Sequence, residues 1–192
     1  MIDKIKNAIS NSISVKEEIL SNNKFLERIE EVSAIIEYCY QTDGKVLLCG
    51  NGGSAADAQH LAAEFSGRFY FDRPPLFAEA LHVNTSYVTA VANDYSYDEI
   101  FARLTKAMGR KGDVLIGLTT SGNSTNIIRA FEEAKKIGMT TIAFTGSSGG
   151  KIRDISDFLF NVPADKTPRI QESHIMIGHI ICELVEEKMF KK

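Results

Sequence analysis

Short, continuous apolar runs that end at polar or glycine-containing loops constrain the fold of this chain more than any other feature. Three of them are KVLLCG at 45–50, GDVLIGL at 112–118 and TTIAFTG at 140–146. Runs of this kind are typical of strands that are buried on both faces of a parallel sheet. LFAEALHV at 76–83 and DFLFNV at 157–162 are two further strand candidates.

Helical patterns separate these runs. A helix is expected from about 126 to 137, with Gly138 placed as its C-cap, and a final helix from about 169 to 190. Strands that alternate with helices through short connections predict a three-layer αβα sandwich. Ligands of such a fold bind beyond the carboxyl ends of the strands.

The first 42 residues predict a helical pair. Apolar residues recur at intervals of three and four in each half, at Ile2, Ile5, Ile9 and Ile13 and then at Phe25, Ile29, Val32 and Ile36. The 192 residues suit one domain, 1–192. Because a small sheet offers too little surface for all these apolar positions, we expect the extension 1–42 to build an oligomer.

Charge and composition exclude several classes of protein. The 22 basic and 25 acidic residues give a net charge of −3 and form no basic stripe, so nucleic acid is not an expected ligand. No apolar run approaches the length of a membrane span. The three cysteines have no metal-type spacing and are read as free thiols of a reducing compartment, which predicts a cytoplasmic protein.

The stretch CGNGGSAADAQHLAAEF at 49–65 places a glycine loop between a strand and a helix. No lysine follows the glycines, so a Walker A loop is excluded. Gly50, Gly52 and Ala55 fit a loose dinucleotide fingerprint, but Asp72 lies in YFDRPP and not at the end of a second strand, which disfavours that interpretation. The alternative is a smaller anion, bound by the helix N-terminus and the Ser54 hydroxyl.

A second loop, TTSGNS at 119–124, has the same position after a strand and supplies four hydroxyl groups in six residues. Such a loop suits a phosphate group. It is equally typical of a serine-rich turn with Ser124 or Thr125 as the N-cap. The presence of two such loops in one sheet favours phosphate binding.

Polar residues share one face of each of two predicted helices. Asp57, His60 and Glu64 follow one another at i, i+3 and i+7, and Gln171 and His179 lie two helical turns apart, whereas His174 points elsewhere. A His and a Glu at this spacing are most often a surface pair. Gln171 and His179 have a capping or packing role as their ordinary explanation.

Four motifs in their order and spacing resemble the phosphoheptose isomerases, a branch of the sugar isomerase (SIS) domain proteins. They are GNGGSAADAQHLAAE, AVANDYSYDEIF, TTSGNSTNI and RIQESHIMIGH, and the resemblance runs from about Lys45 to the carboxyl terminus. It implies a five-stranded parallel sheet between helices. It also implies a homotetramer with active sites at the subunit boundaries.

The implied reaction interconverts sedoheptulose 7-phosphate and D-glycero-D-manno-heptose 7-phosphate, the first step towards the heptose of lipopolysaccharide cores or capsules. By resemblance, zinc is held by His60, Glu64, Gln171 and His179. The substrate contacts implied by the resemblance, together with Ser54 from the first loop, are Asn51, Gly52, Gly53, Ser54, Glu64, Asn93, Asp94, Thr119, Thr120, Ser121, Ser124 and Gln171.

Moving a proton between C1 and C2 of a sugar requires a base and an acid. Glu64 is expected to be the base and His179 to handle the second proton or a sugar oxygen, although an imidazole nitrogen bound to zinc cannot also carry a proton. Some members of the family have an aspartate where this chain has Pro168, so that aspartate's role is absent or moved. Two other functions stay open, namely a non-catalytic SIS tetramer that regulates replication initiation and a SIS isomerase of another sugar phosphate.

Overall fold

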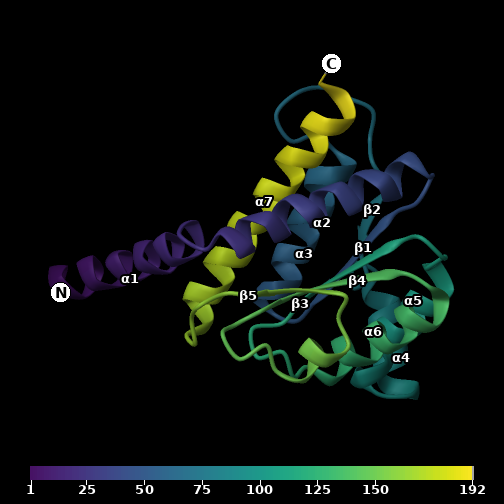
Figure 1. Cartoon of the computed structure of the whole chain (residues 1–192). Helices are drawn as coiled ribbons and strands as arrows, with labels where there is room; N and C mark the ends of the chain where they lie inside the picture. The colour runs from purple at the N-terminus through teal and green to yellow at the C-terminus, as the bar shows by residue number, and fades with distance from the viewer. Residues whose placement is uncertain (192) are drawn as a thin grey trace.

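The computed structural model describes residues 1–191, and a parallel five-stranded sheet forms its centre (Figure 1). The strand order is β2-β1-β3-β4-β5, with every neighbouring pair parallel. The strands are β1 (Val46–Gly50), β2 (Ala78–Ala80), β3 (Val114–Leu118), β4 (Thr140–Thr145) and β5 (Phe158–Asn161). The predicted parallel α/β sheet is thereby confirmed.

Helices cover both faces of the sheet. They are α1 (Ile2–Leu20), α2 (Asn23–Gln41), α3 (Gly53–Ser66), α4 (Thr85–Asp94), α5 (Ile100–Met108), α6 (Thr125–Ile137) and α7 (Thr167–Phe190), with short 3₁₀ helices η1 (Tyr97–Glu99) and η2 (Lys151–Asp154). Figure 1 shows α2, α3 and α7 on one side of the sheet and α4, α5 and α6 on the other. The three layers of the predicted sandwich are therefore present.

Two apolar clusters fill the spaces between these layers. In β1, Val46 and Leu48 pack into the cluster under α2, α3 and α7, while Leu47 and Cys49 pack into the cluster under α5 and α6. Successive side chains of a strand point to opposite faces, so a strand buried on both faces needs an apolar residue at every position. This requirement explains the continuous apolar run.

The second strand is shorter than predicted. The sequence pattern suggested strand structure over 76–83, but β2 covers Ala78–Ala80 alone and lies at the edge of the sheet. It pairs only with β1, and the chain turns at Leu81 and His82 after a last bond from Leu81 N to Leu48 O of 2.8 Å. An edge strand forms hydrogen bonds with one neighbour alone, so β2 ends where its pairing with β1 ends. This accounts for its being shorter than predicted.

The first helix of the predicted N-terminal pair projects away from the body of the molecule (Figure 1). α2 packs on α7, whereas α1 contacts α7 near the start of α7. There Arg169 Nη1 donates to Ala8 O of α1 at 2.5 Å. Four isoleucines of α1 stay exposed, with exposed fractions of 67%, 54%, 56% and 50% for Ile2, Ile5, Ile9 and Ile13. Nothing in residues 1–191 covers this apolar face.

The three cysteines, Cys39, Cys49 and Cys182, are free, as the sequence indicated, and the structure buries all three. Across residues 1–191, no helix combines the length and the apolar character that a membrane span requires.

His174 lies in the core, pointing away from the polar face of α7. Its ring is fully buried, and Nε2 lies 3.1 Å from Thr145 O, so Nε2 carries the proton and donates it to that carbonyl. Burial lowers the pKa of His174 to about 4, against a weaker opposing effect of the Thr145 hydrogen bond. The ring is therefore neutral in the folded protein near neutral pH.

This histidine predicts a loss of stability in mild acid. The unfolded chain takes up the His174 proton near pH 6.5 and the folded chain only near pH 4, so the free energy of unfolding falls between these values by up to about 1.4 kcal/mol per pH unit. His174→Gln keeps an N–H donor for Thr145 O and has no titrating group. Urea unfolding at several pH values should give a shallower pH dependence for the variant, and parallel curves would contradict this account.

Candidate active site and metal centre

The two predicted loops lie side by side at the carboxyl edge of the sheet. One follows β1 and leads into α3, and the other follows β3 and leads into α6. β1 and β3 are neighbours, and the chain winds in opposite directions from them, towards β2 and towards β4 and β5. Such a switch point is where doubly wound sheets open a crevice for ligands. Both loops therefore lie at the edge of the sheet where the sequence predicted a ligand site, and ligand binding there stays a prediction.

Glycines shape the first loop. Gly52 precedes α3 with a φ of +58°, which only glycine adopts at little cost. At Gly50, an added Cβ would lie 2.3 Å from Ser54 O, so this position requires the close approach of two backbone segments. The loop thereby brings Gly53 and the buried Ser54 to the amino end of α3, whose free N–H groups favour an anion.

A pair of amides connects the first loop to α6. Asn51 Nδ2 donates to Asn126 Oδ1 at 3.0 Å, and Asn126 Nδ2 donates back to Asn51 Oδ1 at 2.9 Å. The hydroxyl of Tyr97 also donates to Asn51 Oδ1 at 3.0 Å. The Asn51 side chain thus orders three segments of the site, and a substrate contact at Asn51 stays a prediction.

The hydroxyl loop has internal bonds of its own. Thr119 and Ser124 share a hydrogen bond of 3.0 Å between their hydroxyl oxygens, and Asn123 N donates to Ser121 Oγ at 3.1 Å. Ser124 occupies the N-cap position of α6 without capping it through its side chain, because its hydroxyl is engaged with Thr119. Phosphate contacts by Thr119, Thr120, Ser121 and Ser124 stay predictions.

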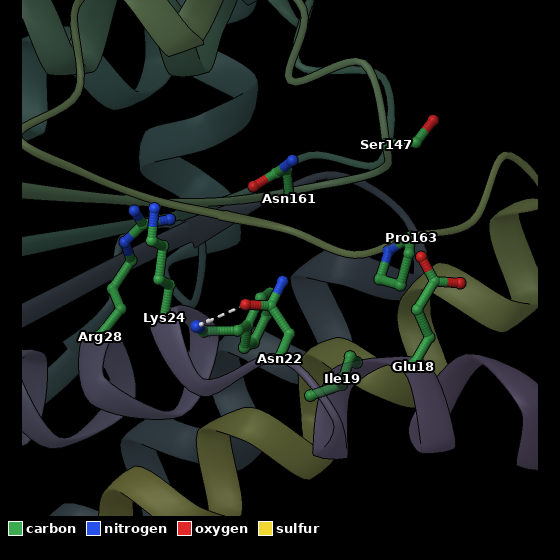
Figure 2. Close-up of a pocket in the computed structure, with 9 residues that line it drawn as sticks. Glu18, Ile19, Asn22, Lys24, Arg28, Ser147, Asn161 and Pro163 are labelled. Carbon is green, nitrogen blue, oxygen red and sulfur yellow. Dashed lines mark hydrogen bonds between the residues drawn. The ribbon is translucent and has the colours of Figure 1, made fainter.

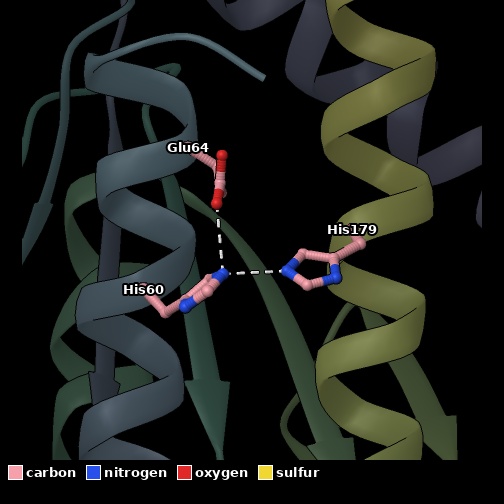
Figure 3. A group of neighbouring side chains, drawn as sticks. All are labelled: His60, Glu64 and His179. Atoms are coloured by element: carbon pink, nitrogen blue, oxygen red, sulfur yellow. Dashed lines mark hydrogen bonds and ion pairs between the residues drawn. The ribbon is translucent and has the colours of Figure 1, made fainter. Parts of the chain in front are cut away.

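The structure brings His60, Glu64 and His179 together. Figure 3 shows His60 and Glu64 on α3 facing His179 on α7. His60 Nε2 lies 3.1 Å from Glu64 Oε1 and 2.9 Å from His179 Nε2, and the three ligand atoms all lie within 4.8 Å of one another. The side chain of His60 is 49% exposed and that of Glu64 25%, so the cluster is open to solvent.

This arrangement fits a metal ion. No single protonation state of His60 satisfies both of its contacts. If Nε2 carries a proton, it can donate to Glu64 but has no lone pair to accept from His179. If Nε2 is unprotonated, it can accept from His179 but has no proton for Glu64. Ligand atoms about 2.0 to 2.2 Å from a tetrahedral zinc ion lie roughly 3.3 to 3.6 Å apart, so the spacings of 3.1 and 2.9 Å require only a small outward movement of the side chains. Two imidazoles and a carboxylate are also a common zinc ligand set.

Charge around the cluster is consistent with this interpretation. Burial lowers the pKa of His179, and the neighbouring His60 lowers it further, against the opposite effects of Glu64 and Asp57. Burial raises the pKa of Asp57, although His60 and His179 lower it in part, and Asp57 Oδ2 is a buried oxygen without a hydrogen-bond partner in residues 1–191. Neutral imidazoles are the form that binds a metal.

The predicted fourth ligand, Gln171, lies near the start of α3. An added Cβ at Gly53 would be 2.6 Å from Gln171 Nε2, so this glycine leaves room for the amide. Leu61 packs against Gly178 further along. Residues near the start of α3 thus contact residues near the start of α7, and later residues of α3 contact later residues of α7, from Gln171 towards His179. Zinc ligation by Gln171 stays a prediction.

Asn93 and Asp94 stand at the carboxyl end of α4, on exposed positions. Asn93 Nδ2 donates to Asp94 Oδ1 at 2.9 Å. Tyr97, three residues further on, connects this segment to Asn51. Their contacts with a substrate also stay predictions.

Several residues at the site were missed from the sequence. Tyr97 and Asn126 order the first loop, and the ring of Phe69 lies 5.7 Å from that of His179. Arg73 and Glu186 form a buried pair beside the cluster. The sequence contains no signal for these contacts, because each joins segments that come together only in the folded chain.

A separate cleft of about 370 Å³ lies where α1 meets α2 (Figure 2). Lys24 and Arg28 extend towards the sheet from α2, with Asn161 opposite them, and Arg28 Nη1 donates to Leu159 O at 2.7 Å. This cleft is lined by residues other than those of the predicted site. The cluster of His60, Glu64 and His179 is an open surface feature and lies elsewhere.

The sheet order, the two anion-type loops at its switch point and the helix that follows each loop are those of a doubly wound α/β domain with a ligand crevice. In agreement, the family model described as SIS domain matches residues 9–146.

The chain belongs to the phosphoheptose isomerase family. It is 53% identical to a phosphoheptose isomerase of Clostridium acetobutylicum over 97% of this chain and 95% of that protein. It is also 53% identical to one of Aneurinibacillus thermoaerophilus, over 100% and 96%. The solved structure of a phosphoheptose isomerase from Francisella tularensis matches with a TM-score of 0.93 and 38% identity, over 97% of this chain and 98% of that one. The resemblance seen in the four motifs is thus confirmed.

Proposed function

We propose that this protein is an aldose–ketose isomerase that converts sedoheptulose 7-phosphate to D-glycero-D-manno-heptose 7-phosphate, the first step of heptose synthesis for a lipopolysaccharide core or capsule. The observation that carries the proposal is the convergence of His60 and Glu64 from α3 with His179 from α7. Family membership supports it, because close relatives are phosphoheptose isomerases.

In this proposal the two loops hold the phosphate. The amino ends of α3 and α6 provide N–H groups, and the hydroxyls of residues 119–124 provide neutral donors. Asn93, Asp94 and Gln171 contact the hydroxyl groups of the sugar. The phosphate then fixes the register of the sugar chain, so that C1 and C2 lie at the cluster.

In this proposal His60, Glu64 and His179 would hold a zinc ion, with Gln171 as a fourth ligand. A bound zinc ion supplies positive charge to the oxygens on C1 and C2, as a Lewis acid. A carboxylate has two oxygens, and Glu64 Oε1 faces His60. Its second oxygen is left for a proton.

The reaction moves one proton between two carbons. Glu64 removes a proton from C1 of the ketose, which leaves an enediol, and a proton is then added to C2. The oxygen on C2 gains a proton as the enediol forms, and the oxygen on C1 loses one as C2 is protonated, so that the product is the aldose. His179 handles the proton at the sugar oxygens when its ring nitrogen is not bound to zinc. When the nitrogen is bound, the ring only orients those oxygens.

A panel of sugar phosphates tests the substrate. The purified protein, supplied with zinc, is incubated with sedoheptulose 7-phosphate, ribulose 5-phosphate or fructose 6-phosphate, and kcat/KM is measured for each. We expect the heptulose phosphate to be preferred. A preference for the pentulose or hexulose phosphate would favour another SIS isomerase, and the absence of turnover with all three would favour a non-catalytic SIS tetramer.

We also propose that the protein is a homotetramer whose subunits meet through the 1–42 extension. The exposed isoleucine face of α1 supports this, because burying one such side chain contributes roughly 1.5 to 3 kcal/mol. A shared interface would also complete an active site that is open in one chain.

Charge placed on α1 tests this assembly. Ile5→Glu combined with Ile9→Glu should shift the mass measured by light scattering from a tetramer to smaller species, because two carboxylates cannot be buried without partners. Ser10→Glu with Ser14→Glu adds the same charge to exposed positions off the isoleucine face and should leave the tetramer intact. A wild-type monomer, or a tetramer that survives the isoleucine changes, would contradict the proposal.

A further inference from the structure

A buried ion pair lies beside the metal cluster. Arg73 follows α3 in the chain and Glu186 belongs to α7, and their side chains are only 2% and 1% exposed. Arg73 Nε donates to Glu186 Oε1 at 2.9 Å. An ion pair so completely removed from water requires further hydrogen bonds to offset its desolvation. The further hydrogen bonds of Arg73 and Glu186 are made with the backbone of the residues next to the site.

On one side, Arg73 caps the carboxyl end of α3. Its Nη2 donates to Glu64 O at 2.8 Å and its Nη1 to Phe65 O at 2.7 Å. The last carbonyls of a helix have no partners within the helix, and a cation near them is favoured by the helix dipole. Arg73 therefore contacts the backbone of Glu64, the residue that supplies the carboxylate of the cluster.

On the other side, Glu186 holds the loop that leaves α3. It accepts from Phe69 N at 2.9 Å and from Tyr70 N at 2.7 Å. Burial opposes the ionisation of Glu186, but the hydrogen bonds from Tyr70, Phe69 and Arg73 outweigh it and keep its pKa below the ordinary value. The loop in turn places the Phe69 ring 5.7 Å from the ring of His179.

The pair thus connects the two helices that carry the cluster. Glu186 stands seven residues after His179 on α7, about two helical turns away. Through Arg73 it reaches the last turn of α3, where Glu64 lies. A metal or catalytic site functions only when its groups are held within about 0.5 Å of the required geometry.

We infer that Arg73 and Glu186 are positioning residues that hold Glu64 and the Phe69 loop in place against His179, a role that rests on the metal site of the proposed function. Neither side chain touches the ligand atoms. Their effect on the cluster passes through the backbone of α3 and the loop that follows it.

A pair that only stabilised the fold would behave differently. Its loss would lower the free energy of unfolding and loosen the molecule as a whole, but the site of the molecules that stay folded would be unchanged. A positioning pair changes the site itself, at temperatures where the protein is fully folded.

Two variants test the inference, each with a matched control. Arg73→Lys keeps the charge but loses the fork that reaches the carbonyls, and Glu186→Gln keeps the shape but loses an acceptor. Arg110→Lys is the control for the first, because Arg110 donates to Ala107 O and Gly109 O at the end of α5, far from the cluster. Glu187→Gln is the control for the second, at the neighbouring position, where the half-buried Glu187 pairs with Lys191 near the end of the helix.

Two measurements are made well below the unfolding temperature, namely the dissociation constant for zinc by competition with a chromophoric chelator, and hydrogen exchange of peptides by mass spectrometry. In Arg73→Lys and Glu186→Gln we expect zinc to bind about 10 to 100 times more weakly, the effect typical of residues that support metal ligands. Exchange should accelerate at the end of α3 and in the 67–73 loop and stay unchanged in α6. Both controls should match the wild type.

Unchanged zinc binding and exchange in both variants, or exchange that accelerates equally in every segment, would overturn the inference. If the wild type binds no zinc, the metal site of the proposed function fails, and the exchange pattern alone then decides whether the pair positions α3. If Arg73→Lys does not fold, Glu186→Gln decides by the same two criteria.

Discussion

Replacement of Glu64 by glutamine should lower kcat for the heptulose phosphate by about 10² to 10⁴, the contribution typical of a positioned base. Glutamine keeps the size of the side chain and an oxygen near His60, but it cannot take up a proton at the pH of the assay. Binding of the phosphate by the two loops does not involve this carboxylate, so KM should change much less than kcat. Steady-state kinetics with zinc in excess separates the two constants.

Glu132→Gln is the matched control, because it makes the same change at an exposed position of α6. It should leave both constants as in the wild type. A Glu64→Gln protein that retains most of its turnover would show that another group is the base.

Removal of the His179 imidazole should abolish tight zinc binding. His179 supplies one of three converging ligand atoms, and even residues that only support a metal ligand contribute about 10- to 100-fold to affinity, so His179→Ala should weaken zinc binding by more than that. Zinc content after dialysis, measured by mass spectrometry, and a chelator competition titration give the result. Turnover should fall together with the zinc content.

His174→Gln provides the comparison, since it changes another histidine of the same helix whose ring lies in the core. It should retain the zinc of the wild type. The double variant Glu64→Gln with His179→Ala adds a second criterion: groups that act as a unit are strongly non-additive, so it should lose little more activity than the worse single variant. Zinc retained by His179→Ala, or losses that multiply in the double variant, would contradict the shared site.

The fold was largely predictable because its signals are local. A strand buried on both faces must be apolar at every position, so 45–50, 112–118 and 140–146 were recognisable without any neighbour. β2 was the exception. Its length depends on how far β1 can pair with it, and this tertiary property is not encoded in the pattern of 76–83.

The parts of the site that lie close together on one helix were predictable from the sequence. His60 and Glu64 are four residues apart on one helix, so their proximity follows from the sequence alone. Their meeting with His179 required the packing of α3 on α7, which the motifs indicated only through the family resemblance. Tyr97, Asn126, Arg73 and Glu186 each act across the fold, and no local pattern reveals such contacts.

The most direct test of the account is to follow sedoheptulose 7-phosphate by NMR in the presence of the zinc-loaded protein, with a chelator and then zinc added in turn. We predict that signals of an anomeric proton on C1 of an aldoheptose 7-phosphate appear, that their growth stops with the chelator, and that it resumes when zinc is restored. A ketose that stays unconverted under all three conditions would contradict the central claim that this site interconverts an aldose and a ketose.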